Sequence, residues 1–160
     1  MYRKVGKMVK IILKNKEDTE RFGTKLGKIL KGGDIISLTG DLGAGKTTLT
    51  QSIGKGLGVK DYITSPSFTI INEYKGRLDV YHFDVYRLDD VDSLYDLGFE
   101  EYFYSDGVTI VEWGNKIKEL LPEYTINIHI DRGEGIEERV VTICGQGDRF
   151  DQIVKELNVN

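Results

Sequence analysis

The segment that most constrains this chain is Gly40-Asp41-Leu42-Gly43-Ala44-Gly45-Lys46-Thr47-Thr48, which has the Gly-x-x-x-x-Gly-Lys-Thr spacing of a phosphate-binding loop. The stretch before it, residues 35–39, is mostly apolar and typical of a buried strand, and residues 47–55 read as a helix. A strand, a glycine-rich loop and a helix in this order gather backbone N–H groups and the positive end of a helix dipole around one anion. The sequence therefore predicts a nucleoside triphosphate site.

Each part of this loop has a distinct expected role. Gly40, Gly43 and Gly45 allow the backbone to curl so that its N–H groups point at the phosphates. The Lys46 ammonium supplies a point charge for the β- and γ-phosphates, and the Thr47 hydroxyl is placed to ligate Mg²⁺. The nucleotide is expected to contact Asp41, Leu42, Gly43, Ala44, Gly45, Lys46, Thr47 and Thr48.

Composition narrows the class of protein. The 160 residues are enough for one domain, 1–160, with a core, and no apolar run approaches the roughly 18 residues of a membrane span. The basic start lacks the apolar stretch of a signal peptide, and Met8 offers an alternative start that would leave residues 1–7 as a loose tail. A single cysteine, Cys144, indicates a reducing, cytoplasmic location. The net charge of −4 argues against broad electrostatic binding of nucleic acid, so a partner is expected to hold any RNA.

Hydrophobic periodicity predicts strands at residues 8–13, 35–39, 67–74, 78–84, 108–112, 124–131 and 139–144, and helices at 16–30, 47–55, 89–97, 100–103, 116–121 and 150–157. Strands that alternate with helices around a phosphate loop predict an α/β, P-loop NTPase-like fold of three layers. We expect a mixed, mostly parallel sheet with helices on both faces. Two hairpins, 67–84 and 124–144, would add its antiparallel strands.

Two carboxylates are candidates to hold Mg²⁺ beside Thr47. Glu112 ends the most apolar strand, and Asp84 ends the strand that runs to Phe83. One acid could bind the metal directly and the other through water, and the sequence leaves open which does so. If Glu112 is not a ligand, it is placed to orient the attacking water. The predicted catalytic residues are thus Lys46, Asp84 and Glu112.

Several other features have two interpretations each. The segment Thr64-Ser65-Pro66-Ser67-Phe68 is either a switch that senses the γ-phosphate through its hydroxyls or a plain loop. His82 shares a strand face with Asp84, and a packed histidine is the commoner case than a catalyst. Arg87 is either a phosphate clamp or, by default, part of a structural salt bridge.

One segment of the sequence bears on whether the nucleotide carries adenine or guanine. The run Asn115-Lys116-Ile117-Lys118 nearly matches the Asn-Lys-x-Asp guanine reader of GTPases. Lys118 stands where that reader needs an acid, and lysine cannot accept hydrogen bonds from the guanine edge. The sequence therefore favours ATP over GTP.

Five motifs together resemble the TsaE (YjeE) family of bacterial ATPases: residues 40–49, 64–68, 72–74, 82–87 and 111–114, in the family's order and spacing. The resemblance covers nearly the whole chain. It implies a role in forming N6-threonylcarbamoyladenosine in tRNAs that read codons starting with adenine. It also implies that the chain binds a TsaB–TsaD heterodimer and that its ATP turnover resets that complex between catalytic cycles. Because the sequence offers no obvious arginine finger near the γ-phosphate and no large lid, we expect slow hydrolysis by the chain alone and faster turnover with partners.

The same resemblance implies roles for individual residues. Lys46 would contact phosphate, Thr47 and Glu112 would lie near Mg²⁺, Asp84 would belong to the catalytic site, and residues 64–68 would be the switch. Thr19 resembles the family's nucleotide-contacting hydroxyl, and Arg139 its base-side arginine. Ser67 departs from the threonine that the family often has, but it keeps the hydroxyl.

Two other classes of function remain open on the sequence. A small-molecule kinase would need an arginine-rich lid, whereas residues 84–108 carry mostly acidic charges. A nucleotide-gated binding module would use ATP only as a ligand that locks a docking surface.

Overall fold

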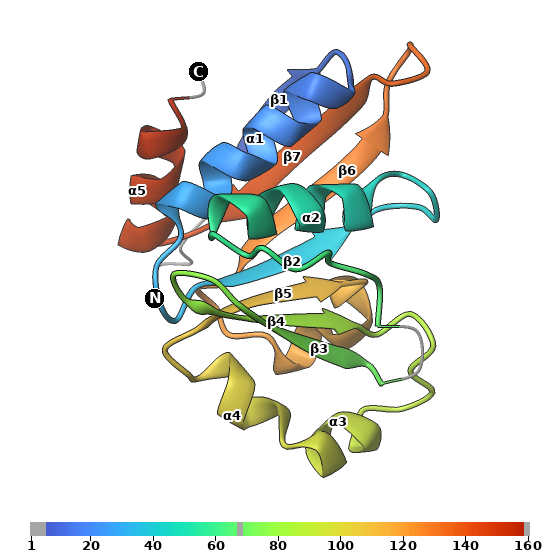
Figure 1. Ribbon diagram of the computed structural model, residues 1–160, viewed down its shortest axis with the longest axis vertical. Coiled ribbons are helices and arrows are strands. Elements are labelled where there is room, and N and C mark those ends of the chain that lie inside the picture. Colours follow the sequence, from blue (N-terminus) through green and yellow to red (C-terminus); the bar gives the residue numbers. More distant parts are fainter. Residues whose placement is uncertain (1–5, 67–68, 159–160) are drawn as a thin grey trace.

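A computed structural model of the chain describes residues 6–66 and 69–158 and shows one seven-stranded sheet with helices on both faces (Figure 1). Its strands are β1 (Lys7–Leu13), β2 (Ile35–Thr39), β3 (Ile71–Lys75), β4 (Asp79–Asp84), β5 (Val108–Glu112), β6 (Ile126–Arg132) and β7 (Arg139–Gly145). Its helices are α1 (Lys16–Ile29), α2 (Lys46–Gly56), α3 (Asp92–Leu97), α4 (Phe99–Phe103), the 3-10 helix η1 (Gly114–Leu120) and α5 (Asp148–Leu157).

The strands lie in the order β1-β7-β6-β2-β5-β4-β3. Strands β6, β2, β5 and β4 are parallel to one another, with β2 at the centre of the sheet. Strands β3 and β7 pair antiparallel with their neighbours, and the hairpins β3–β4 and β6–β7 form as predicted. The mixed, mostly parallel α/β fold with helices on both faces is therefore confirmed.

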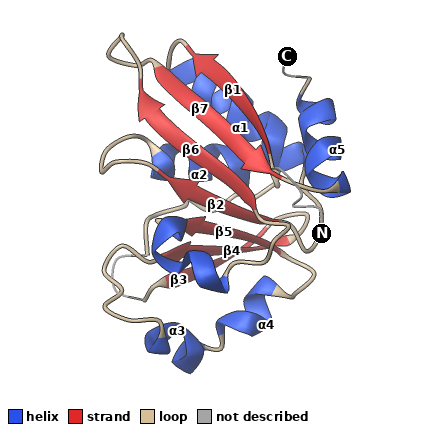
Figure 2. Cartoon of the chain, turned by 180° about the vertical axis from the view of Figure 1, so that it is seen from behind, coloured by secondary structure: helices blue, strands red, loops and turns tan. Residues whose placement is uncertain are grey.

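Two hydrophobic cores fill the layers on either side of this sheet. Helices α1, α2 and α5 cover one face, where Leu26, Leu49 and Ile153 pack on β2, β5, β6 and β7 (Figure 1). Residues of α3, α4 and η1 pack on the opposite face of β2, β4 and β5 (Figure 2). Neighbouring residues of a strand point to opposite faces, so Val80 and Ile110 belong to the first core, and Phe83 and Val111 to the second.

Helices α1 and α2 approach each other unusually closely. A Cβ atom added to Gly27 would lie 2.1 Å from the Ile53 carbonyl oxygen and 2.8 Å from the Gly56 Cα atom. A Cβ added to Gly56 would lie 2.1 Å from the Thr24 carbonyl oxygen. Glycine at these positions is what lets the two backbones touch, and the contact fixes the position of α2 over the sheet.

Several predicted boundaries were wrong. The strand expected at 67–74 begins at Ile71, because Ile70 has a left-handed backbone (φ 68°) that interrupts an extended chain. The helix expected from residue 89 begins at Asp92, whose N–H is taken by the Asp90 side chain at 2.9 Å. The turn expected at 113–115 is shorter, because Gly114 already begins η1. The other predicted elements are present to within two residues at each end.

Some expectations concern residues at the edges of the described chain. Of the expected tail 1–7, residues 1–5 lie outside the described residues, and Lys7 belongs to β1, paired with Gly145. Ser67 and Phe68 of the expected switch also lie outside them. Within residues 6–66 and 69–158, every helix is too short or too polar to cross a membrane.

Candidate active site

The phosphate loop joins β2 to α2 and has the backbone that its glycines were expected to allow. Gly40, Gly43 and Gly45 have positive φ angles of 145°, 80° and 112°. A Cβ added to Gly40 would lie 2.5 Å from the Ile130 carbonyl oxygen, so no larger residue fits there. The curl ends at Gly45, the residue before the first turn of α2, and thus brings the N-terminus of a three-turn helix to the concave side of the loop.

Lys46 opens α2, and its ammonium group is held inside the loop. Nζ donates hydrogen bonds to the carbonyl oxygens of Gly40 at 2.6 Å and Asp41 at 2.8 Å. It also lies 4.0 Å from the centre of the Trp113 ring, in a cation–π contact. Burial lowers the pKa of Lys46, and the opposing fields of Glu112, Asp84 and Asp41 offset only part of that effect. The ammonium thus has neutral partners in direct contact and would gain from an anion placed beside it.

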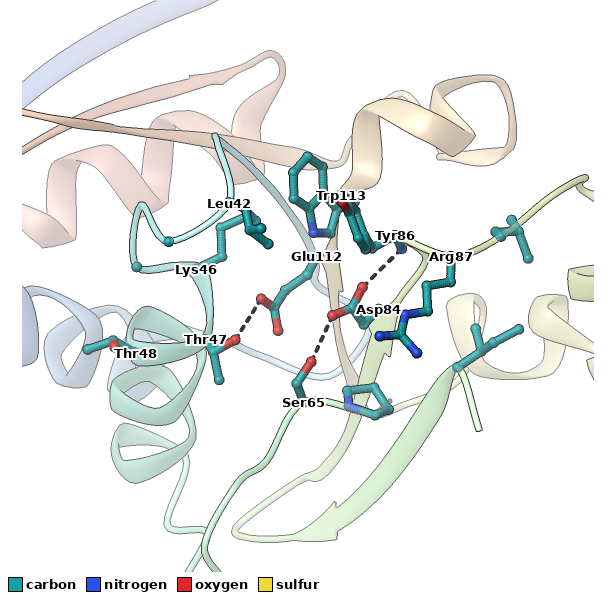
Figure 3. A pocket seen from close by; sticks show the side chains of 15 residues that line it. Leu42, Lys46, Thr47, Thr48, Ser65, Asp84, Tyr86, Arg87, Glu112 and Trp113 are labelled. Carbon is teal, nitrogen blue, oxygen red and sulfur yellow. Dashed lines mark hydrogen bonds between the residues drawn. The ribbon is translucent and has the colours of Figure 1, made fainter. Parts of the chain in front are cut away.

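Thr47 and Glu112 face each other across the opening between α2 and β5 (Figure 3). The Thr47 hydroxyl donates to Oε1 of Glu112 at 3.0 Å. Glu112 is only 2% exposed, and its second oxygen, Oε2, is hydrogen-bonded to Nε2 of His82. The carboxylate is therefore held from both sides and turned toward the helix that carries Lys46 and Thr47.

Asp84 lies beside Glu112 because the two are register partners on the parallel strands β4 and β5. Its Oδ2 accepts a hydrogen bond from the Ser65 hydroxyl at 2.8 Å, and its Oδ1 accepts one from the Tyr86 backbone N–H at 3.0 Å (Figure 3). Ser65 belongs to the expected switch segment. A hydrogen bond therefore fastens this segment to one of the two acids.

Two cavities meet at the phosphate loop. The larger, of about 740 Å³, lies between the loop and the ends of β4 and β5. It is lined by Leu42, Gly43, Gly45, Lys46, Thr47, Thr48, Ser65, Pro66, Ile70, Asp84, Tyr86, Arg87, Leu88, Glu112 and Trp113. The smaller, of about 260 Å³, is lined by Lys16, Thr19, Ala44, Gly45, Thr48, Ile130, Ile136, Glu137 and Arg139. Gly45 and Thr48 line both cavities, so the loop lies between a compartment that contains Asp84 and Glu112 and one that contains Thr19 and Arg139.

Two arginines from the β6–β7 hairpin brace the loop from outside. Arg139 Nε donates to the Ala44 carbonyl oxygen at 2.8 Å, and Arg132 Nη2 donates to that of Gly43 at 3.3 Å. Arg139 also faces the smaller cavity together with Thr19 of α1. Thr19, expected to contact the nucleotide, and Arg139, expected on the side of the base, are thus brought together in the smaller cavity, away from the two acids.

The larger cavity suits a hard divalent cation held jointly with phosphate. Among residues 6–66 and 69–158, no cluster of three or more His, Cys, Asp and Glu side chains could form a closed metal centre. Mg²⁺ is commonly bound by one or two carboxylates together with substrate phosphates, and it keeps several waters. Thr47, Glu112 and Asp84 provide such a set, with one hydroxyl and two carboxylates lining the same open cavity.

The structure brings most of the predicted residues together. Lys46, Thr47, Asp84 and Glu112 line one cavity, with Ser65 and Pro66 from the switch segment. Asp41 takes part through its carbonyl oxygen, while its side chain lines neither cavity. Thr64 is exposed and lines neither cavity; its backbone is bound by Tyr74 and Asn72.

Sequence reasoning gave too little weight to four residues. His82 is fully buried against Glu112, the Lys46 ammonium lies over the Trp113 ring, and the Tyr86 ring lies tilted against Trp113 with centres 4.7 Å apart. Arg87 lines the larger cavity and forms no ion pair with any described residue, so the default salt bridge was not found. Their positions in the sequence could have identified them, because all four lie at or just beyond the C-terminal ends of parallel strands. Ligands bind at these ends in open α/β sheets.

The guanine-reader-like run lies elsewhere. Residues 115–118 belong to η1 on the opposite face of the sheet, where Ile117 is buried and Lys116 donates to the Tyr86 carbonyl oxygen. None of these residues lines either cavity. The interpretation of Lys118 as a residue at the base-reading position therefore has no support from its location.

Comparisons with known proteins agree with this fold and site. The family profile described as "Threonylcarbamoyl adenosine biosynthesis protein TsaE" matches residues 13–141. A protein of Bacillus subtilis (strain 168) named "tRNA threonylcarbamoyladenosine biosynthesis protein TsaE" is 43% identical over 145 residues, 90% of each chain. A Treponema pallidum protein of the same name is 41% identical over 76% of this chain and 90% of its own.

A solved structure shows the same fold. The crystal structure of Bacillus subtilis YdiB superposes with a TM-score of 0.78 at 40% identity, covering 96% of this chain and 95% of that one. Sequence and fold therefore agree over nearly the full length of the chain. The chain belongs to the TsaE family, whose members are named for the biosynthesis of threonylcarbamoyladenosine in tRNA.

Proposed function

We propose that this protein is a magnesium-dependent ATPase that serves N6-threonylcarbamoyladenosine formation in tRNAs reading codons that start with adenine, by acting on a TsaB–TsaD complex. One observation carries the proposal. Lys46 and Thr47, at the N-terminus of the helix after the phosphate loop, face Glu112 and Asp84 across a single cavity. A cation and helix N–H groups on one side, with two acids on the other, suit a triphosphate bound together with Mg²⁺.

In this proposal, each residue of the site has a separate role in hydrolysis. The loop N–H groups and Lys46 bind the β- and γ-phosphates and stabilise the charge that builds up on the leaving group. Bound Mg²⁺ would neutralise phosphate charge, held by Thr47 and the two acids. Whichever of Glu112 and Asp84 does not bind the metal directly is free to accept a hydrogen bond from the attacking water and to orient it.

The open shape of the larger cavity supports slow turnover by the isolated chain. The cationic side chains that line it are Lys46 and Arg87, and Arg87 is exposed. An arginine inserted by a partner in other phosphate-loop enzymes is worth roughly 10³–10⁵ in rate. We therefore expect TsaB–TsaD binding to close this cavity and accelerate hydrolysis.

The smaller cavity supports a nucleoside on the other side of the loop. Thr19, Arg139 and Ile136 provide a hydroxyl, a cation and an apolar surface within about 260 Å³. These groups suit a ribose and the face of a base. ATP is the proposed nucleotide.

The test is the ATP hydrolysis rate of the purified chain with and without purified TsaB–TsaD. We expect little hydrolysis by the chain alone, at least a tenfold increase with the partners, and loss of the increase in Lys46→Ala. Turnover of tens of molecules per second by the chain alone, unchanged by the partners, would overturn the partner-activated mechanism.

Glu112→Gln distinguishes an ATPase from a nucleotide-gated binding module. The variant keeps the size of the side chain and removes its charge, so it should bind ATP and partners but fail to support tRNA modification. If it supports modification at the wild-type rate without hydrolysis, ATP acts only as a ligand. Chromatography of the reaction with a metabolite pool tests the kinase alternative, which requires a phosphorylated product besides ADP and phosphate.

A further inference from the structure

A buried histidine continues the hydrogen-bonded pair of Thr47 and Glu112 into the core. Nε2 of His82 contacts Oε2 of Glu112, and Oε1 of the same carboxylate accepts the Thr47 hydroxyl at 3.0 Å. We propose that His82 is a positioning residue, which holds the Glu112 carboxylate turned toward Thr47 and the larger cavity. This inference rests on the proposed ATPase function and adds a residue that acts through Glu112.

Strand register explains why these two side chains meet. Asp84 pairs with Glu112 and His82 pairs with Ile110, on the adjacent parallel strands β4 and β5. Alternate residues of a strand share a face, so His82, Asp84 and Glu112 all point to the side covered by α2. On β4, His82 lies two residues before Asp84 and thus farther from the end of the strand. Seen from the cavity, it lies behind the Glu112 carboxylate.

Burial makes this contact decisive for the orientation of Glu112. His82 is 0% exposed and Glu112 is 2% exposed, so little water is available to replace a lost hydrogen bond. A buried carboxylate without partners pays a large desolvation penalty and would rotate toward another donor. His82 contacts one oxygen of the Glu112 carboxylate, and Thr47 donates a hydrogen bond to the other.

The other ring nitrogen indicates which tautomer is present. Nδ1 of His82 is buried and has no hydrogen-bond partner among the described residues. A buried N–H group without an acceptor is rarer than an under-satisfied acceptor, so we assign the proton to Nε2, where it is donated to Glu112. A proton on Nε2 gives Glu112 a fixed hydrogen-bond donor.

A purely structural role for His82 makes different predictions from a positioning role. If His82 only fills space, any substitution should reduce activity in proportion to the lost stability. If it positions Glu112, a donor at the same place should preserve the rate, and the effect should vanish once Glu112 no longer carries a charge. Outer residues that orient metal ligands typically contribute about 10–100-fold to affinity or activity.

The experiment compares His82→Leu, which keeps bulk without a donor, with His82→Gln, whose amide can still donate. Val80→Ala is the matched control, because Val80 is equally buried on the same face of β4 and lies outside the site. With TsaB–TsaD present, we expect His82→Leu to lower kcat about 10–100-fold and to leave the KM for ATP within about threefold. His82→Gln should retain kcat to within about fivefold, and Val80→Ala should lower the melting temperature but not kcat.

Two further measurements make the result specific. In the Glu112→Gln background, His82→Leu should cause no additional loss of kcat. In the wild-type chain without nucleotide, ¹⁵N NMR of the histidine side chains should show His82 as the Nε2–H tautomer, with a resonance that shifts in Glu112→Gln.

Parallel losses in His82→Leu and His82→Gln that follow their melting temperatures would overturn the positioning role, as would an Nδ1–H tautomer. The NMR result needs neither turnover nor a substituted His82, so it still judges the inference if the His82 variants fail to fold. If the wild-type chain with partners does not hydrolyse ATP, the proposed function fails, and the NMR result alone decides whether His82 holds Glu112.

Discussion

At the scale of single residues, the buried ammonium group of Lys46 lowers the stability of the fold. Burial lowers the pKa of this ammonium from its ordinary 10.5, which means that the fold disfavours its charged form. Nearby carboxylates and the Trp113 ring compensate for only part of the lost hydration. If Lys46 binds phosphate as proposed, the protein gives up stability for that binding.

We therefore expect Lys46→Met to raise the melting temperature of the ligand-free protein at pH 7. The destabilising effect of the charge is complete below the folded-state pKa and disappears as the pH rises through that value to 10.5. The gain from the substitution should accordingly shrink between pH 7 and pH 10.5, which thermal unfolding followed by circular dichroism measures. The exposed Lys28→Met is the control and should change little. A lower melting temperature for Lys46→Met at pH 7 would contradict this account.

The residue scale also shows what local sequence can predict about the site. The roles of Gly40 and Gly45 follow from a motif whose residues are adjacent in the chain, and their φ angles of 145° and 112° agree with it. The pairing of His82 with Glu112 depends on the register of two strands 30 residues apart. No local pattern encodes that register, so His82 looked like an ordinary core histidine.

At the scale of elements, the contact between α1 and α2 determines where α2 lies over the sheet. Gly27 and Gly56 bring the two backbones together, and α2 carries Lys46 and Thr47 at its other end. A side chain at this contact would push α2 away from the sheet, and would separate Thr47 from Glu112.

Gly27→Ala tests this dependence. Alanine is favoured over glycine in a helix by about 1 kcal/mol. The added methyl group would, however, lie 2.1 Å from the Ile53 carbonyl oxygen, and overpacking of this kind costs about 1–3 kcal/mol or more. We expect a net loss in the free energy of unfolding, measured by urea denaturation, and weaker ATP binding. Lys28→Ala, on the exposed side of the same helix, should stay within about 0.5 kcal/mol of the wild type. Unchanged or increased stability of Gly27→Ala would show that the two helices can separate freely.

The bounds of helices and strands were predicted well where the hydrophobic pattern alone determines them. Strand β5 and helix α1 begin and end within one residue of the predicted positions, because each is bounded by clear polar or glycine residues. The start of β3 and the turn after β5 were wrong because each depends on one residue with a left-handed backbone, Ile70 and Trp113. Such conformations are uncommon for these residue types and are set by tertiary contacts.

At the scale of the whole molecule, both cavities should contribute to nucleotide binding. ATP with Mg²⁺ at about 100 times its Kd would stabilise the fold by roughly 2.7 kcal/mol. For a chain of this size, that corresponds to a rise in melting temperature of roughly 5–11 °C. We expect a smaller rise when EDTA removes Mg²⁺, and no Mg²⁺-dependent increment in Thr47→Ala. Equal shifts with and without Mg²⁺ would show that Thr47, Glu112 and Asp84 do not hold the metal.

Charge is unevenly distributed over the molecule. Residues 88–107, which include α3 and α4, contain seven acidic residues and no lysine or arginine, although the net charge of the whole chain is only −4. This acidic end repels the phosphodiester backbone of RNA. The distribution supports the proposal that tRNA is held by partner proteins rather than by this chain.

The stack of Lys46 on Trp113 gives the protein an optical reporter of its own state. Trp113 is the only tryptophan in the sequence, so all indole emission comes from the wall of the larger cavity. Movement of the ammonium from the ring to a phosphate would change the polarity that the indole senses. Titration of ATP against emission excited at 295 nm could then follow occupancy without a label, and stopped-flow mixing with partners could time each cycle.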